Sequence, residues 1–440
     1  MSDRHRVVVV GGGFAGINAV KRLRDAPVDI TLVDRRNFHL FQPLTYQVAT
    51  GALSPGEVAY PLRVLFRRDR NVRVLLAEVT GFDLEAREVS LGPAGGLEAP
   101  SALPYDTLIV AAGSSYSYFG HDEWSEVAAE VKSLESALIV RTRLLAAFER
   151  AEMSTSEEER DAELTFVIVG GGPTGVEMAG QIGELARDTL RRDFRLIDPG
   201  SARVLLVELG DRLLPAFPQT LSESSARQLR QLGVTPVLNR TVVAIDREST
   251  TVQAPDGRTE RIPARTVIWA AGVSASPLAS KLGAESGADV DRAGRVSVDP
   301  HLTLPAHPEV IALGDMISVR DGQGGHRDLP GVAPVAIQQG HYAARLVRDR
   351  LEGRPTKPFD YFDKGNVATI GRGRAVADLG VIRLGGPLAW LVWLVIHLWY
   401  LIGFQNRLLV LIRWSISFWT HGRGARLITR PAGGEAESRI

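Results

Sequence analysis

Two glycine-rich segments are the part of this sequence best suited to chemistry. They are Val7–Gly16 (VVVVGGGFAG) and Phe166–Gly175 (FVIVGGGPTG). Each places an apolar, β-type run directly before G-x-G-x-x-G and an amphipathic helix after it, the context of a dinucleotide-binding turn. The helix N-terminus then faces the phosphates. We therefore expect the chain to hold two dinucleotides.

The glycines of each turn have separate roles. In the first turn Gly11 allows the tight turn, Gly13 lets the backbone approach a pyrophosphate, and Gly16 packs the helix on the strand. In the second turn, Gly170, Gly172 and Gly175 occupy the same positions.

An acid follows each turn at the end of the next predicted strand. Asp34 follows the strand Ile30–Val33, and Glu208 follows the strand Arg203–Val207. A carboxylate there accepts hydrogen bonds from ribose hydroxyls and repels a 2′-phosphate, which favours NAD over NADP. The alternative, two purely structural glycine turns, must explain these acids as well.

Composition excludes several classes of enzyme. The 440-residue chain has zero formal net charge and no cysteine. Without cysteine it cannot reduce disulfides through a dithiol, form a sulfenate, carry sulfur or ligate an iron–sulfur cluster through thiolates. Zero net charge gives no electrostatic case for nucleic acid. The nine histidines show no metal-type spacing, so we predict no metal site.

The rest of the chain indicates a repeated α/β fold. Thr266–Gly272 (TVIWAAG) echoes Thr107–Gly113 (TLIVAAG), as expected if one fold occurs twice. We predict two Rossmann-like dinucleotide-binding domains, the second inserted in the first, plus a C-terminal membrane-associated helical region. Other expected elements are a strand at Val72–Leu76, loops at Asn37–Gly51 and Gly92–Ala102, a helix containing Leu134 to Phe148, a solvated acidic linker at Ser154–Glu163, a strand at Val310–Asp315 and a helix at Tyr342–Leu351.

The composition changes sharply from Pro387. Leu388–Phe404 contains no charged residue, and five of the seven tryptophans fall between Trp390 and Trp419. From Leu379 to Gly434 the chain has no Asp or Glu but has six arginines: Arg383, Arg407, Arg413, Arg423, Arg426 and Arg430. The apolar run is at the short limit for a membrane span. We expect an interfacial helix held by tryptophan and by anionic lipid, with a buried core helix and a true span as alternatives.

Two dinucleotides on one chain indicate hydride transfer from a nicotinamide to a flavin. An apolar tail in a chain without thiols or clusters favours a lipid-soluble electron acceptor.

Longer motifs carry a more specific resemblance. They include FQPLTYQVATG, FVIVGGGPTGVEMAG, VIWAAGV, ALGDM, APVAIQQG, FDKGNVATIGR and the tail WLVWLVIHLWYLIGFQNRLLVLIRW. Together they resemble type II NADH:quinone oxidoreductase, the single-subunit, non-proton-pumping NADH dehydrogenases within the pyridine nucleotide-disulfide oxidoreductase-like flavoproteins. The resemblance runs from Val7 to about Thr429.

The resemblance implies non-covalent FAD on the split domain and NADH on the inserted one. Implied FAD-binding residues are Gly11, Gly13, Phe14, Gly16, Asp34, Ala112, Gly113, Asp315 and Gln338. Implied NADH-binding residues are Gly170, Gly172, Thr174, Gly175, Glu177, Glu208, Ala271 and Gly272. The implied layout is 1–120 and 291–380 for FAD, 121–163 as connecting helix and linker, 164–290 for NADH and 381–440 as membrane anchor.

Three residues are implied to be catalytic: Glu177, Gln338 and Lys364. Gln338 and Gln339 match the family segment that meets flavin and quinone, whereas Pro334 stands where many relatives have a further glutamine. Lys364 would stabilise reduced flavin as a fixed cation. A helix N-terminal acid is the alternative for Glu177 and a surface lysine the alternative for Lys364.

The expected activity is hydride transfer from NADH to FAD and two-electron reduction of a membrane quinone without proton pumping. The resemblance implies a peripheral homodimer on the cytoplasmic face of the cell inner membrane. Two alternatives remain: a soluble NAD(P)H-dependent flavin reductase for a ferredoxin or rubredoxin partner, and a NADH-binding redox sensor.

Overall fold

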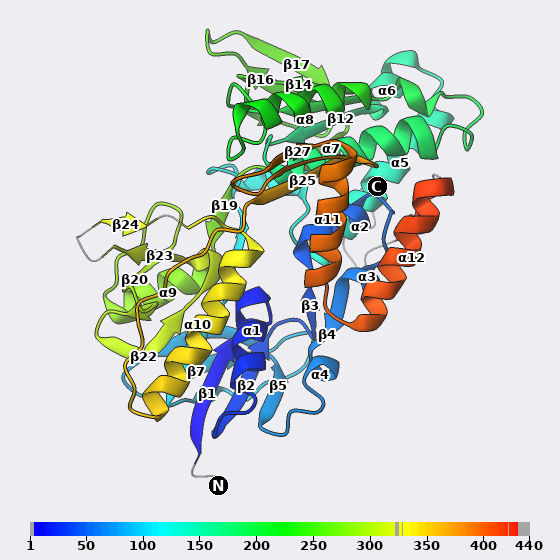
Figure 1. Cartoon of the computed structure of the whole chain (residues 1–440). Coiled ribbons are helices and arrows are strands. Elements are labelled where there is room, and N and C mark those ends of the chain that lie inside the picture. Colours follow the sequence, from blue (N-terminus) through cyan, green and yellow to red (C-terminus); the bar gives the residue numbers. More distant parts are fainter. Residues whose placement is uncertain (1–3, 322–324, 328, 421, 430–440) are drawn as a thin grey trace. The chain divides into compact units, whose positions relative to one another are not determined.

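The computed structural model describes residues 4–321, 325–327, 329–420 and 422–429, and the chain divides into two compact units (Figure 1). Unit 1 comprises Met1–Leu40, Ala59–Ser115 and Val273–Asp363. Unit 2 comprises Phe41–Val58, Tyr116–Gly272 and Lys364–Ile440. Two of the five unit boundaries fall in or beside the short strands β10 (Ser114–Tyr116) and β19 (Val273–Ala275).

This division differs from the predicted layout in four segments. Residues 41–58, 116–120 and 364–380 are assigned by sequence to the FAD-binding domain but belong to unit 2, and residues 273–290 are assigned to the NADH-binding domain but belong to unit 1. The predicted tail beyond Thr429, Arg430 included, lies outside the described residues.

Unit 1 is built on a six-stranded sheet of order β21-β22-β9-β1-β2-β5. Strands β22, β9, β1, β2 and β5 run parallel, and β21 is antiparallel to β22. The apolar run VVVV of β1 is buried throughout, as expected for a central parallel strand covered on both faces. The strand bounds are β1 His5–Val10, β2 Val28–Asp34, β5 Val72–Leu76, β9 Thr107–Val110, β21 Thr303–Leu304 and β22 His307–Ala312.

Two helices of unit 1, α1 (Phe14–Leu23) and α10 (Ala333–Leu351), pack against each other at a glycine (Figure 1). A Cβ added at Gly340 would lie 2.3 Å from the Ala15 carbonyl oxygen. Helix α10 starts earlier than Tyr342, the start we predict from sequence. Pro334 fits its first turn, where no N–H donor is needed, so the IQQG segment is helical.

The remaining elements of unit 1 are short. They are β3 Phe38–Leu40, β4 Ala59–Pro61, α4 Leu62–Leu65, β6 Glu78–Asp83, β7 Glu88–Gly92, β8 Ala102–Pro104, α9 Pro277–Ser286, β20 Val296–Val298, β23 Ile317–Arg320 and β24 His326–Arg327.

Unit 2 repeats the plan with a parallel five-stranded sheet of order β11-β18-β12-β13-β14. Its strands are β11 Ala128–Glu130, β12 Thr165–Val169, β13 Arg203–Val207, β14 Val234–Val237 and β18 Thr266–Trp269. An antiparallel sheet follows, formed by β15 Thr241–Ile245, β16 Ser249–Gln253 and β17 Thr259–Pro263. Both units therefore carry a parallel sheet with a glycine turn after a central strand, which is the predicted α/β fold.

Unit 2 contains several helices that we do not predict from sequence, one of them within the predicted loop Asn37–Gly51 and another in place of the predicted acidic linker. Its helices before residue 272 are α2 Thr45–Ala49, α3 Pro55–Val58, α5 Leu134–Met153, α6 Glu157–Glu163, α7 Pro173–Glu184 and α8 Gln219–Gln231. Helix α6 replaces the predicted linker. The Glu163 side chain is 2% exposed and pairs with Arg150 at 2.8 Å and Arg265 at 3.0 Å, so this acidic stretch is held by a buried carboxylate.

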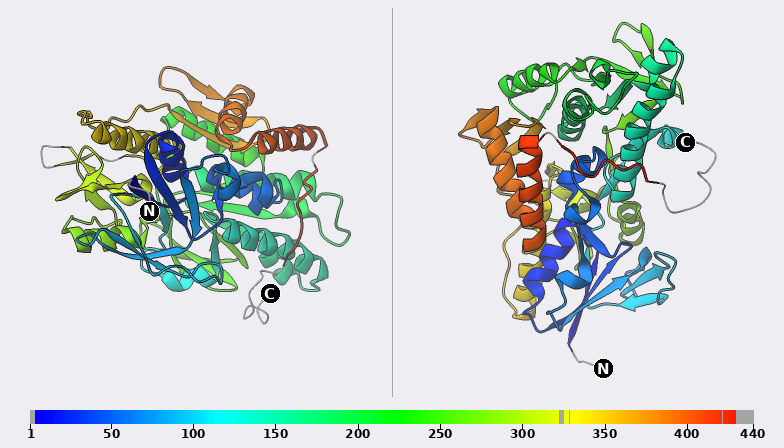
Figure 2. Two further views of the ribbon diagram at one scale, coloured as in Figure 1. Left: turned by 90° about the horizontal axis from the view of Figure 1, so that it is seen from below. Right: turned by 90° about the vertical axis from the view of Figure 1, so that its right-hand side faces the viewer.

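The C-terminal part of unit 2 is a small sheet followed by two helices. The sheet contains β25 Asn366–Gly371, β26 Arg374–Asp378 and β27 Arg383–Gly385. The predicted single apolar helix is two helices, α11 (Pro387–Tyr400) and α12 (Phe404–Thr420), with Gly403 at φ +87° before α12. Figure 2 shows the two helices side by side. The ring centroids of Trp393 and Trp414, one from each helix, lie 5.0 Å apart. Among the described residues, no helix is long and apolar enough to cross a membrane.

The close approach at Gly340 predicts that Gly340→Ala destabilises the protein. The added methyl group would have to displace the α1 backbone, at a cost of roughly 1–3 kcal/mol. Thermal or urea unfolding measures the loss. Gly56→Ala is the control, because a Cβ there would meet nothing within 4 Å. Equal stabilities for the two variants would contradict this account.

Candidate functional site

The first glycine turn follows β1 and places its three glycines as the predicted roles require. Gly11 has φ +102°, and a Cβ there would lie 2.3 Å from the Ala111 carbonyl oxygen. A Cβ at Gly16 would lie 1.9 Å from the Gly11 carbonyl oxygen. At Gly13, the N-cap of α1, a Cβ would meet nothing within 4 Å. The turn is therefore crowded where helix meets strand and open where a phosphate would approach.

The second turn has the same geometry in unit 2. Gly170 has φ +108°, and a Cβ at Gly175 would lie 1.8 Å from the Gly170 carbonyl oxygen. Gly172, the N-cap of α7, is open. Two cradles with the same shape exist in one chain.

The two acids bind the turns themselves. The Gly12 N–H donates to Asp34 Oδ2 at 2.5 Å, and the Gly171 N–H donates to Glu208 Oε2 at 2.5 Å. The second oxygen of Glu208 accepts from the Gly210 N–H at 2.7 Å. Burial raises the pKa of Asp34, and the hydrogen bonds that it accepts from the Gly12 and Arg36 N–H groups oppose that rise. Sequence reasoning finds the acids but misses this contact with the turn.

Phe14 and the segment 112–113 border the first turn in unit 1. Phe14 meets the buried His39 ring edge-on at 5.0 Å, and His39 Nδ1 donates to the Gly12 carbonyl at 2.9 Å. Burial lowers the pKa of His39 to about 4, so the ring is neutral at pH 7. Gly113 has φ +67° and open space at its Cβ position. The Ala112 N–H donates to the Met316 sulfur at 3.3 Å.

The residues predicted near the flavin in α10 divide between two environments. Gln339 is fully buried, and its Oε1 accepts from the Gly314 N–H at 2.6 Å, next to Asp315. Its Nε2 has no partner among the described residues, which leaves a buried donor for a bound group. Gln338 instead makes two hydrogen bonds to the backbone of Phe362, at 2.9 and 3.0 Å. Asp315 accepts from the Ser114 hydroxyl at 2.7 Å.

Glu177 is the most perturbed acid of the predicted set. Its carboxyl group is buried in α7 and accepts from the Thr369 N–H at 3.4 Å. Burial raises the pKa of Glu177 to about 8, so the group is mostly protonated at pH 7. A neutral carboxylic acid held inside the protein can donate a hydrogen bond or a proton.

Other predicted residues of unit 2 have defined neighbours. Thr174 forms a side-chain hydrogen bond with the half-buried Tyr116. Gly272 has φ +68° after Ala271, and a Cβ there would lie 2.4 Å from the Phe119 ring. Lys364 Nζ donates to the Tyr400 hydroxyl at 3.0 Å, so this lysine is tied to α11.

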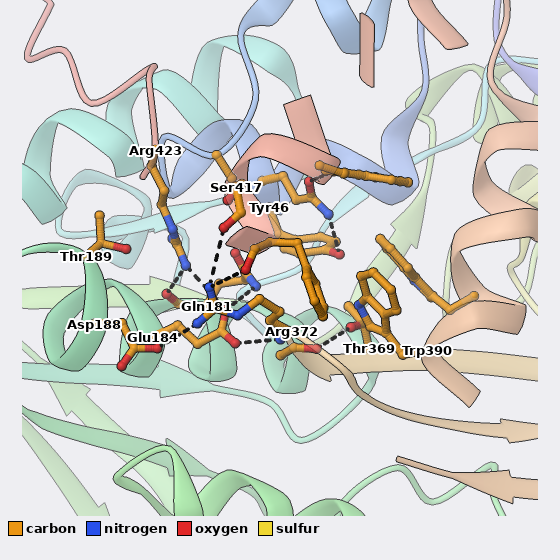
Figure 3. Close-up of a pocket in the computed structure, with 16 residues that line it drawn as sticks. Tyr46, Gln181, Glu184, Asp188, Thr189, Thr369, Arg372, Trp390, Ser417 and Arg423 are labelled. Atoms are coloured by element: carbon orange, nitrogen blue, oxygen red, sulfur yellow. Dashed lines mark hydrogen bonds and ion pairs between the residues drawn. The ribbon is translucent and has the colours of Figure 1, made fainter. Parts of the chain in front are cut away.

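A cavity lined by tryptophan lies in unit 2 between α7, β25, α11 and α12 (Figure 3). Its volume of about 70 Å³ suits a few water molecules. Trp393 contributes a buried indole N–H with no partner among the described residues, and Trp414 Nε1 donates to Gln47 Oε1 at 2.8 Å. We therefore expect ordered water here.

Charged groups at the base of this cavity fasten the tail (Figure 3). Glu184 accepts from the Arg372 N–H at 2.5 Å and pairs with Arg423 at 3.5 Å. Burial lowers the pKa of Arg423 to about 10, while Glu184 opposes that shift. Sequence reasoning misses Glu184, Arg372 and the FQPLTYQVATG residues Tyr46 and Gln47. Glu184 lies seven residues after Glu177, a spacing that keeps both on one helix face.

No group of histidine, aspartate and glutamate side chains suited to a metal ion occurs in the part of the chain that the structure describes.

Comparison with known proteins gives consistent matches over nearly the whole chain. The pyridine nucleotide-disulphide oxidoreductase family model matches residues 5–340, and the NDH2 C-terminal domain matches residues 364–423. Type II NADH:quinone oxidoreductases NdhA and Ndh of Mycobacterium tuberculosis are 46% and 47% identical. The matches cover 98% and 97% of this chain and 90% of each relative.

A solved structure shares the fold. NDH2 from Plasmodium falciparum in complex with NADH has a TM-score of 0.85 at 20% identity, covering 97% of this chain and 100% of that chain.

The raised pKa of Glu177 predicts a pH-dependent loss of stability. An unfolded glutamate releases its proton near pH 4.5, whereas the folded chain retains it until about pH 8. Between these values the folded state binds more protons, so the free energy of unfolding falls as pH rises. The loss should reach on the order of 3 kcal/mol by pH 7.

Urea unfolding at several pH values between 5 and 9 measures this slope. Glu177→Gln should remove it, while the exposed Glu223→Gln should keep it. A slope unchanged in Glu177→Gln would show that this carboxyl group is not the one that titrates.

Proposed function

The chain belongs to the type II NADH:quinone oxidoreductases, and from this premise we propose which residues perform NADH oxidation and quinone reduction. The observation that carries the assignment is the pair of matching turns, each crowded at its third glycine and open at its second. Membership of this family disfavours the soluble flavin reductase and the redox sensor.

We assign the unit 1 turn to FAD. The open backbone at Gly13 would meet the pyrophosphate, Asp34 the adenosine ribose, and Asp315 the ribityl or phosphate region. In this proposal the same site is lined by Phe14, Ala112, Gly113 and Gln339, whose Nε2 has no partner among the described residues. Gln338 is the remaining residue that we predict to bind FAD. FAD, when bound, accepts a hydride and returns two electrons.

The unit 2 turn is assigned to NADH. Gly172 would meet the pyrophosphate, Glu208 the adenosine ribose, and Thr174, Ala271 and Gly272 the neighbouring surface. Glu208 spends one oxygen on the Gly171 N–H and the other on the Gly210 N–H. Since a carboxylate has about four lone-pair sites, it retains capacity for ribose hydroxyls.

In this proposal Glu177 holds a proton and Lys364 supplies a positive charge. Quinone reduction by NADH consumes one proton from solution in each turnover, and protonated Glu177 can hold that proton inside the protein. Lys364 provides a fixed cation whose position is set by Tyr400.

We also propose that α11 and α12 attach the protein to the membrane. Each helix buries one side and exposes a second apolar side. The buried residues are Ala389, Trp393, His397, Asn406 and Val410, and the largely exposed ones include Leu391, Val395, Trp399, Phe404, Ile412 and Trp419. Full burial of such a side chain contributes roughly 1.5–3 kcal/mol, so each of these partly exposed side chains contributes a part of that amount when it enters an apolar phase.

The tail arginines contribute less to lipid attraction than the sequence suggests. Arg383, Arg413, Arg423 and Arg426 each pair with an acid of the protein. Arg407 donates to the Leu401 and Trp399 carbonyls at the end of α11, at 2.7 and 2.8 Å. Apolar burial therefore dominates attachment in this proposal. The homodimer and the cytoplasmic face of the inner membrane stay predictions.

The function and the nucleotide preference are tested together. NADH should bleach the bound flavin of the purified protein, and a soluble quinone should restore its colour. Glu208→Gln should lower the ratio of NADH to NADPH efficiency on the order of tenfold, because the repulsion of the 2′-phosphate is lost. Stopped-flow absorbance measures both. Arg212→Gln, a neighbouring loop change, is the control, and equal use of both nucleotides by the wild type would refute the assignment of Glu208.

Membrane attachment is tested on the exposed apolar side of α11. Truncation before Pro387 is unsuitable, since α11 covers Ala375 and Ala377 of β26. Leu391→Glu/Trp399→Glu should instead abolish vesicle binding and slow turnover with long-tailed quinone, while flavin reduction by NADH is unchanged. Flotation with vesicles measures binding.

Leu196→Glu is the matched control, because Leu196 is a 74% exposed leucine in a loop outside the two helices. High salt should leave binding of the wild type intact, since apolar burial is not screened. Full release by salt alone would contradict the proposal.

A further inference from the structure

A groove on unit 1, here called the basic groove, lies between the C-terminal halves of α1 and α10. Its volume is about 710 Å³, within the range of roughly 300–1,000 Å³ that is typical of ligand sites. None of the groups assigned to NADH oxidation lines it. Its cationic lining consists of Lys21, Arg22, Arg24, Arg345, Arg348 and Arg354.

Positive charge in the basic groove is not balanced by its acids. The lining includes two carboxylates, Asp25 and Asp349, so its net charge is +4 with His341 neutral. Asp349 is engaged by Arg354 at 3.1 Å, and Asp25 lies 3.6 Å from Arg24. Both acids are thus committed to neighbours of opposite charge, and Arg354 also pairs with Glu352, an acid outside the lining, at 2.5 Å.

Helix dipoles explain only part of this arrangement. A helix C-terminus attracts cations because it carries about half a negative charge. Two such ends offset about one of the four excess positive charges. The dipole effect is confined to the last turn, so it does not account for Arg345 or for Arg354 beyond the helix end.

Arg348 holds one of these guanidinium groups in the groove. Its guanidinium donates to the Arg22 carbonyl at 2.5 Å, which holds the side chain in the groove. Its Nε is buried and has no hydrogen-bond partner among the described residues. Arg345 lies three residues earlier on the same helix face, where like charges repel in the absence of a ligand.

We infer that the basic groove binds an anion that carries two or more phosphate groups. Guanidinium groups pair with phosphate oxygens through two parallel N–H donors, and several arginines converge here. The close packing of α1 on α10 at Gly340 holds both walls in place. The phosphates belong either to a soluble polyphosphate or to the headgroup of a lipid with two phosphates.

Calorimetric titration with tripolyphosphate tests the site. The FAD-loaded protein is used with saturating NAD⁺, so that the dinucleotide site is blocked. The wild type should bind one equivalent, and Arg22→Gln/Arg345→Gln, which changes two exposed side chains, should weaken binding at least about tenfold. The exposed Arg258→Gln in unit 2 should leave binding unchanged. NADH-driven flavin reduction should be equal in all three proteins.

Vesicles distinguish the two sources. Phosphatidylcholine vesicles with and without cardiolipin are compared for the wild type and the double variant. A preference for cardiolipin that the double variant loses identifies the lipid headgroup, and an unchanged preference with lost tripolyphosphate binding identifies a soluble ligand. The inference is overturned if the wild type shows neither saturable tripolyphosphate binding nor a cardiolipin preference, or if the double variant matches the wild type in both.

Discussion

In each unit, the close approach of a helix to the backbone of the glycine turn determines how the neighbouring elements are placed. Gly16 and Gly175 bring a helix so close to the preceding turn that an added Cβ would lie 1.9 or 1.8 Å from a carbonyl oxygen. The approach fixes the angle between strand and helix and leaves the second glycine open at the helix N-terminus. Orphan N–H groups and the positive end of the dipole then face the same open space, which suits a pyrophosphate.

The acid after the next strand completes this arrangement from the other side. By accepting the N–H of the middle glycine, Asp34 and Glu208 hold each turn against its neighbouring strand. These carboxylates therefore stabilise the turns themselves, in addition to the ribose contacts that we propose for them. This contact accounts for the position of each acid. Asp34 ends β2 and Glu208 directly follows β13, and from there each carboxylate reaches the glycine turn.

The local pattern of apolar and polar residues predicts the strands that are formed by a short apolar run. The strands β5 and β13 occur at the predicted residues, because their apolar runs are bounded by polar ones. The same pattern does not predict features that depend on contacts with residues far away in the sequence. Helix α6 depends on the pairing of Glu163 with Arg265, and the separate directions of Gln338 and Gln339 depend on Phe362 and Gly314. No periodicity in the sequence encodes such partners.

The two turns share their geometry but differ one helical turn later. Counting from the open glycine, Glu177 of α7 corresponds to Asn18 of α1. Asn18 satisfies itself by donating to the Phe14 carbonyl at 2.8 Å, as a neutral side chain can. Glu177 is buried with one weak backbone donor, so it retains a proton where α1 has an amide. In our proposal the two turns are equivalent nucleotide sites, and protonated Glu177 gives the second one a group that can hold a proton.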